Sequence, residues 1–175
     1  MDRETRIAWL VDHYHRPRHK GALADADARV PGGNPGCGDI ITMYLKAAEP
    51  SAAVEEHRIA VVTWEGSGCT LSQAAASILA ERVNRDKTSF EEILSISPEG
   101  WMDVLGRDIA ESRPQCALLA LGTLKAAVKA VEMNRKLAEA GHTQQQIREL
   151  RREDAGLHSP DAIIQQAPAS LGAAP

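Results

Sequence analysis

The sequence is poor in aromatic residues, in net positive charge and in long apolar runs. Its 175 residues include one Phe, two Tyr and three Trp, which is too few for a surface that stacks the bases of a single strand. Twenty Lys and Arg stand against 24 Asp and Glu, so the basic footprint of a nucleic-acid-binding protein is missing. No run approaches the roughly 18 apolar residues that cross a bilayer. We therefore expect neither nucleic acid nor a membrane as a partner.

Cysteine is also scarce, with only Cys37, Cys69 and Cys116. An odd number cannot form a complete disulfide framework. The first four residues lack the basic and then apolar order of a secretory signal. These features favour a cytoplasmic, reducing location, where thiols more often bind metal or react than form disulfides.

The first half of the chain carries the strand signals. Residues 21–36 are rich in Gly, Pro and Asn and are expected to form a loop. Residues 40–45 alternate in hydrophobicity and 58–64 are rich in β-branched side chains, so both are predicted to be strands. Pro50 and Ser51 are expected to turn the chain between them.

Helical periodicity and cap signals predict the other elements. The first helix covers about 5–15, and the apolar spacing predicts a buried face formed by Ile7, Leu10, Val11 and Tyr14. Later helices begin near residues 70, 89, 97 and 112, and the last reaches about 140. The expected caps are Thr70 with Gln73, Ser89 with Glu92, Ser97 before Pro98, and Ser112 with Gln115. Strands followed by helices favour an α+β fold over a parallel βαβ fold.

A domain boundary is predicted near residue 140. Residues 1–140 would form the folded domain and 141–175 an extension, with a polar helix over about 144–153. From about residue 155 the chain is rich in Ala, Pro, Gln and Ser and is expected to be disordered.

Each cysteine lies beside a glycine or proline at the end of a predicted element. Cys37 lies in a glycine-flanked turn, Cys69 directly precedes a helix, and Cys116 lies in the first turn of another. Free N–H groups at helix N-termini favour thiolate, which is the form that binds metal and attacks sulfur. The alternative is that the three cysteines merely pack as small apolar side chains, and their wide spacing matches no zinc finger.

Four motifs, in order, are shared with a known family. They are His13-Tyr14-x-x-Pro17-Arg18-x-x-Gly21, Asn34-Pro35-x-Cys37-Gly38-Asp39, Gly66-x-Gly68-Cys69-x-x-Ser72-x-Ala74 and Cys116-Ala117-x-Leu119. Over about residues 7–131 the chain resembles the IscU/NifU/SufU family, whose members are scaffold proteins for iron–sulfur cluster assembly.

The resemblance implies a fold, a site and partners. The fold is a small antiparallel sheet of about three strands packed against helices, with a long C-terminal helix. Cys37, Asp39, Cys69 and Cys116 would bind iron or a [2Fe–2S] cluster, and Cys116 would accept persulfide sulfur from a cysteine desulfurase. Asp39 would make the site labile, because a carboxylate oxygen is a harder ligand than thiolate. Recipient iron–sulfur apoproteins would then take the cluster.

Two other functions remain open on the same residues. A SufU-like sulfur acceptor would hold zinc on Cys37, Asp39, Cys69 and Cys116 and act as a sulfurtransferase, whereas the cluster scaffold is a carrier rather than a turnover enzyme. In a purely structural or interaction protein, the cysteines would pack and the C-terminal helix would bind a partner.

The sequence departs from the family pattern in two places. Gln115 precedes the third cysteine, where members carry His or Lys, so no titrating ligand is available there. Residues 109–115 lack the Leu-Pro-Pro-Val-Lys motif, which leaves a dedicated chaperone a doubtful partner.

Two further patterns are tempting but weak. His13, His15 and His19 cluster in sequence, yet residues two apart do not share a helix face, so a solvated helix end is expected rather than a metal site. Residues 31–38 are rich in glycine but lack the Gly-Lys-Ser/Thr ending of a phosphate-binding loop.

Overall fold

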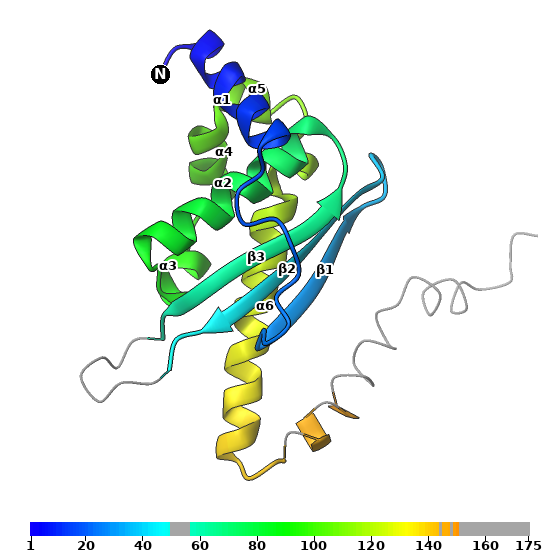
Figure 1. Ribbon diagram of the computed structural model, residues 1–175, viewed down its shortest axis with the longest axis vertical. Coiled ribbons are helices and arrows are strands. Elements are labelled where there is room, and N and C mark those ends of the chain that lie inside the picture. Colours follow the sequence, from blue (N-terminus) through cyan, green and yellow to red (C-terminus); the bar gives the residue numbers. More distant parts are fainter. Residues whose placement is uncertain (50–56, 144, 148, 151–175) are drawn as a thin grey trace, which may run out of the picture. The chain divides into compact units, whose positions relative to one another are not determined.

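A computed structural model describes residues 1–49, 57–143, 145–147 and 149–150 (Figure 1). The chain divides into two compact units, 1–131 and 132–175. The elements are α1 (Arg3–His15), β1 (Ala28–Asn34), β2 (Asp39–Ala47), β3 (Ile59–Ser67), α2 (Thr70–Asp86), α3 (Phe90–Ser95), α4 (Pro98–Leu105), α5 (Arg107–Ala110) and α6 (Pro114–Glu139).

The three strands form one antiparallel sheet in the order β1-β2-β3. Ile41, Met43 and Leu45 alternate along the central strand and are buried, whereas Ile40, which precedes them, is exposed. The predicted α+β fold, with a three-stranded sheet and a long helix near the C-terminus, is confirmed. The expected turn at residues 50–51 lies outside the described residues.

Strand β1 corrects the expectation of a loop over residues 21–36. Its glycines and proline, which suggested irregular backbone, fit an edge strand: Pro31 lacks an N–H that a central strand would need, and it pairs with Thr42 of β2. Gly32 lies against α6, where a Cβ atom would collide with the Thr123 hydroxyl. The composition of β1 thus reflects the close approach of α6 rather than a turn.

Helix α1 buries only Leu10 of its predicted face, together with His13. Leu10 and His13 are its buried residues, while Ile7 and Val11 are exposed. The expectation of a solvated His13 is wrong, because its ring Nδ1 lies 2.8 Å from Ser77 Oγ on α2, and the edge of the ring contacts Trp9. The hydroxyl of Ser77 gives the buried imidazole a hydrogen-bond partner, which the apolar spacing of α1 could not indicate.

Cap residues begin the helices, although not always those predicted. Ser89 with Glu92 forms the expected capping box, and Ser97 caps α4 as expected. The N-cap of α2 is Cys69 rather than Thr70. Ser112 does not cap α6, because its hydroxyl donates to the carbonyl of Ile109 and thereby closes α5, a short helix that the periodicity did not indicate.

Helices α2 and α6 supply much of the core. Small side chains let other elements approach α2 closely: Ala74, Ala75, Ala76 and Ala80 are all fully buried, so its buried surface is wider than one face. The core also ties α4 to α6, because the indole N–H of Trp101 donates to the carbonyl of Ala117 over 3.0 Å. This packing fixes the first turn of α6 within the first unit.

In the second unit, residues 145–147 and 149–150 are helical, and the expected break around residues 141–143 is present. The rest of the helix predicted over 144–153, and the tail beyond it, lie outside the described residues. The boundary near residue 140 remains a prediction. None of the helices in the described part of the chain has the length and apolar character of a membrane-spanning segment.

Gly32→Ala should destabilise the fold by about 1–3 kcal/mol, since the added methyl overpacks the contact between β1 and α6. The chain offers a matched compensating change, Thr123→Ala, which removes the hydroxyl that the methyl would meet. Urea unfolding of both single variants and the double variant measures the coupling. Strictly additive losses would show that the two positions do not touch.

The buried imidazole should make stability depend on pH. Burial lowers the pKa of His13 below its ordinary value of 6.5, assisted by the positive charge of Arg18 and opposed by Glu81 and Asp12. The unfolded chain therefore binds the proton more readily, and this contribution to stability is complete above about pH 6.5 and falls as pH decreases through that value.

His13→Gln should flatten this decrease in urea-unfolding free energy between neutral and mildly acidic pH. His15→Gln, which removes an exposed imidazole from the same helix, is the control and should keep the wild-type slope. Equal slopes for wild type and His13→Gln would contradict the assignment.

Candidate metal centre

The sheet register brings the sequence-predicted residues together. Asn34 pairs with Asp39 at the end of the β1–β2 hairpin, so the turn between them presents Cys37 beside the carboxylate. At the other side of β2, Ile40 pairs with Ser67, so the chain leaving β3 reaches Cys69 next to Asp39. Cys116 arrives from the first turn of α6.

Three of the four predicted residues form a tight cluster. The sulfur atoms of Cys37 and Cys116 are 3.4 Å apart. With a carboxylate oxygen of Asp39 they give three potential ligand atoms that all lie within 4.8 Å of one another. Cys69 stands outside this group, but its Sγ is 3.9 Å from Asp39 Oδ2. The carboxylate of Asp39 thus contacts the third sulfur as well as belonging to the cluster.

The four predicted site residues differ in their exposure to solvent. Cys37 is exposed and Cys69 half-buried, whereas Cys116 and Asp39 are each 1% exposed. A molecule that approaches from solvent thus meets Cys37 first.

Asp39 is a buried carboxylate held ionised by donors. Burial by itself would raise its pKa, but hydrogen bonds from the Cys116 thiol, the Cys69 backbone N–H, Ser72 and Asn34 outweigh burial and bring the pKa below its ordinary value. The bond from the Cys69 N–H to Oδ1 is 2.7 Å long. Asp39 consequently carries negative charge inside the site.

The surroundings shift the pKa values of two thiols in opposite directions. Burial opposes ionisation of Cys69, but the backbone N–H and hydroxyl of Ser72 outweigh it and lower the Cys69 pKa. Burial raises the pKa of Cys116, as do its hydrogen bonds to Asp39 and the other two thiols. Without a cation, the thiol of Cys69 ionises more easily than that of Cys116, which stays protonated. A cation would replace the proton at Cys116.

Gly68 is required for the contact between Asp39 and the start of α2. A Cβ atom at this position would collide with Asp39 Oδ1 and would lie 2.7 Å from Ser72 Oγ. The glycine of the Gly66-x-Gly68-Cys69 motif therefore makes room for the carboxylate.

Two site residues were not assigned a role from sequence. Asn34 donates from Nδ2 to Cys116 Sγ over 3.4 Å, and the N–H of Ser72 points at Cys69 Sγ over 3.5 Å. Both residues belong to the cysteine-containing motifs, and this membership is the sequence signal that could have identified them. Gln115 is exposed, and its amide oxygen is directed towards the turn at Gly36.

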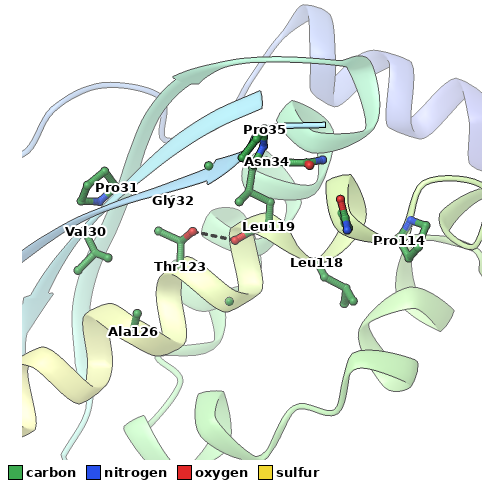
Figure 2. A pocket seen from close by; sticks show the side chains of 13 residues that line it. Val30, Pro31, Gly32, Asn34, Pro35, Pro114, Leu118, Leu119, Thr123 and Ala126 are labelled. Atoms are coloured by element: carbon green, nitrogen blue, oxygen red, sulfur yellow. Dashed lines mark hydrogen bonds between the residues drawn. The ribbon is translucent and has the colours of Figure 1, made fainter. Parts of the chain in front are cut away.

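A groove of about 620 Å³ adjoins the cluster between β1 and α6. Figure 2 shows that strand residues such as Pro31 and helix residues such as Leu119 and Ala126 line it. Asn34 and Gln115 stand at the end of the groove that leads to the cysteines.

The ligand types fit a soft, tetrahedral cation. Two thiolates bound at about 2.3 Å to one tetrahedral ion lie about 3.8 Å apart, close to the 3.4 Å between Cys37 and Cys116. Thiolates select zinc or iron, and a single carboxylate adds a harder ligand. The fold and this cluster define a small α+β protein with a cysteine–aspartate cluster that could hold a metal ion.

Known proteins agree with this class. A family model of the NifU-like N-terminal domain matches residues 8–138. The iron–sulfur cluster assembly scaffold protein IscU of Thermotoga maritima is 32% identical, over 70% of this chain and 91% of that protein. The zinc-dependent sulfurtransferase SufU of Bacillus subtilis is 36% identical over 74 residues, which cover 42% of this chain and 45% of SufU.

A solved structure shares the fold. The N-terminal part of a NifU-like protein from Brucella abortus superposes with a TM-score of 0.58 at 17% identity, over 71% of this chain and 92% of that one. The chain belongs to the NifU-like N-terminal domain family. The resemblance noted from the four motifs is thereby confirmed.

The cysteines of the metal-free, reduced protein should differ in reactivity. At neutral pH Cys116 should be alkylated much more slowly than Cys69, because it is buried and its pKa is raised, whereas that of Cys69 is lowered. Peptide mapping after timed iodoacetamide treatment measures each rate. In urea the difference should vanish, and equal rates in the native protein would contradict the described environments.

Proposed function

We propose that this protein is a scaffold on which [2Fe–2S] clusters are assembled and from which they are transferred. Cys37, Asp39, Cys69 and Cys116 bind the iron, a cysteine desulfurase supplies the sulfur, and iron–sulfur apoproteins receive the product. Family membership supports the scaffold role. The observation that carries it to these residues is the cluster of Cys37, Asp39 and Cys116.

Sulfur would arrive as persulfide on Cys116. The Cys116 thiolate attacks the terminal sulfur of the donor's persulfide, so that a new S–S bond forms as the donor's S–S bond breaks and the donor's cysteine leaves as thiolate. Over the whole step the proton of Cys116, whose thiol is hydrogen-bonded to Asp39, passes to the donor's departing thiolate. The cytoplasm is the proposed location of these reactions, since they require reduced thiols.

Each ligand type has a separate part in transfer. Thiolates hold iron strongly, whereas the carboxylate of Asp39 is a harder and weaker ligand for it. Releasing the carboxylate first would open the assembled cluster to a recipient's thiolates. We assign this work to the domain of residues 1–140 and leave the extension of 141–175 outside it.

A second candidate function is zinc-dependent sulfur transfer. It is favoured by the distance of 3.4 Å between Cys37 and Cys116, which suits two ligands of one tetrahedral ion, and by the similarity to SufU. In this function the four residues hold zinc, and one thiolate leaves it to take sulfur from the desulfurase. The protein would then be an enzyme-like sulfurtransferase rather than a carrier.

Anaerobically purified protein should contain iron and acid-labile sulfide in equal amounts and show visible charge-transfer absorption. Cys37→Ala should weaken this absorption, because one soft ligand is lost. Asp108→Asn, which changes an exposed carboxylate on α5, is the control and should keep it. Iron, zinc and sulfide analysis together with the visible spectrum are the measurements.

The same analysis separates the candidates. One tightly held zinc without sulfide would replace the scaffold function by zinc-dependent sulfur transfer. Protein that takes up neither metal nor cluster after anaerobic reconstitution would leave the cysteines with a packing role and refute both.

A further inference from the structure

Asn34 connects every part of the proposed metal centre except Cys69. Its main-chain carbonyl accepts the N–H groups of Cys37, over 3.1 Å, and of Gly38, over 2.9 Å, and so closes the turn that presents the first cysteine. Its side chain donates from Nδ2 to Cys116 Sγ over 3.4 Å and also hydrogen-bonds to the carboxylate of Asp39. One residue thus holds three of the four ligands.

The carboxamide of Asn34 is buried. Asn34 is 5% exposed, and a polar side chain so buried needs its hydrogen bonds satisfied. Figure 2 shows it at the end of β1, where the strand reaches the first turn of α6. An apolar side chain of similar size would remove one donor from both the sulfur and the carboxylate.

The Asn34 carboxamide differs from the thiol donors in that it keeps its N–H in every state of the site. A thiol loses its proton when it binds metal, so the S–H contacts among the cysteines disappear on loading. The N–H···S bond remains and becomes stronger, because its acceptor is then charged. Hydrogen bonds to ligand sulfurs also withdraw electron density and adjust the reduction potential of iron–sulfur sites.

We propose that Asn34 is a positioning residue, which holds the sulfur of Cys116 towards Cys37 and Asp39 and donates a permanent hydrogen bond to it in the loaded site. This inference rests on the proposed metal binding but not on whether the cargo is a cluster or zinc. It also gives a function to Asn34, the first residue of the Asn34-Pro35-x-Cys37 motif, which is not itself one of the proposed ligands.

Cobalt(II) titration of the reduced full-length chain tests the inference, because sulfur-to-cobalt charge transfer reports directly on the ligand sulfurs. Asn34→Leu removes the donor and keeps the approximate volume, and Asn34→Ala truncates it. Both retain the main-chain carbonyl that closes the turn. We expect cobalt affinity to fall about 10–100-fold, as is usual when a partner of a metal ligand is lost, and the charge-transfer band to shift to lower energy.

Asn84→Leu is the matched control. The Asn84 carboxamide is also part-buried, but it hydrogen-bonds to the backbone of Val62 and Ala80 rather than to a sulfur. This variant should lower the melting temperature and leave the charge-transfer energy unchanged. The comparison separates loss of stability from loss of the N–H···S bond.

Each outcome decides a different point. Wild-type protein without any sulfur-to-cobalt band would refute the proposed metal site and the role of Asn34 with it. Wild-type protein that binds cobalt through sulfur, with either folded Asn34 variant showing an unchanged band energy, would refute the role of Asn34 alone. If Asn34→Leu fails to fold, Asn34→Ala carries the test.

Discussion

The hydrogen bond between the Asp39 carboxylate and the backbone N–H of Cys69 joins the start of the central strand to the start of the most buried helix. A buried carboxylate is stable only when donors surround it, and here they come from three elements that are distant in sequence. The same bond explains why position 68 excludes any side chain. Fold and site therefore depend on one charged group.

Strand pairing and core packing bring the three sulfurs together. Antiparallel pairing brings two of the cysteines to one end of the sheet, and the packing of Trp101 against the first turn of α6 brings the third. Close approach of α6 to the edge strand is possible because Gly32 has no side chain. The candidate site is thus a product of ordinary packing, to which its cysteines and aspartate add local hydrogen bonds.

Much of this could be predicted from sequence, because strong periodicity and cap residues act locally. The strands at 40–45 and 58–64, most helix starts and the three cysteines at element ends followed from such signals. The strand at β1 did not, since the reason for its glycines lies in α6. The buried face of α1 was predicted only in part: Leu10 is buried as expected, but His13 is buried against a hydroxyl on another helix, which the periodicity of α1 does not encode. The roles of Asn34 and Ser72 depend on contacts that spacing does not encode.

Cys69 has two tasks that rest on the same atom: its sulfur accepts the Ser72 N–H as the N-cap of α2, and it lies beside Asp39 as a candidate ligand. Serine is among the preferred N-cap residues and would accept the same N–H through oxygen. A single-atom exchange from sulfur to oxygen could then abolish the chemistry while the helix begins as before. The capping of α2 and the chemistry of the thiol are therefore separable at this position, so a relative with serine here could keep the fold and lose the thiol.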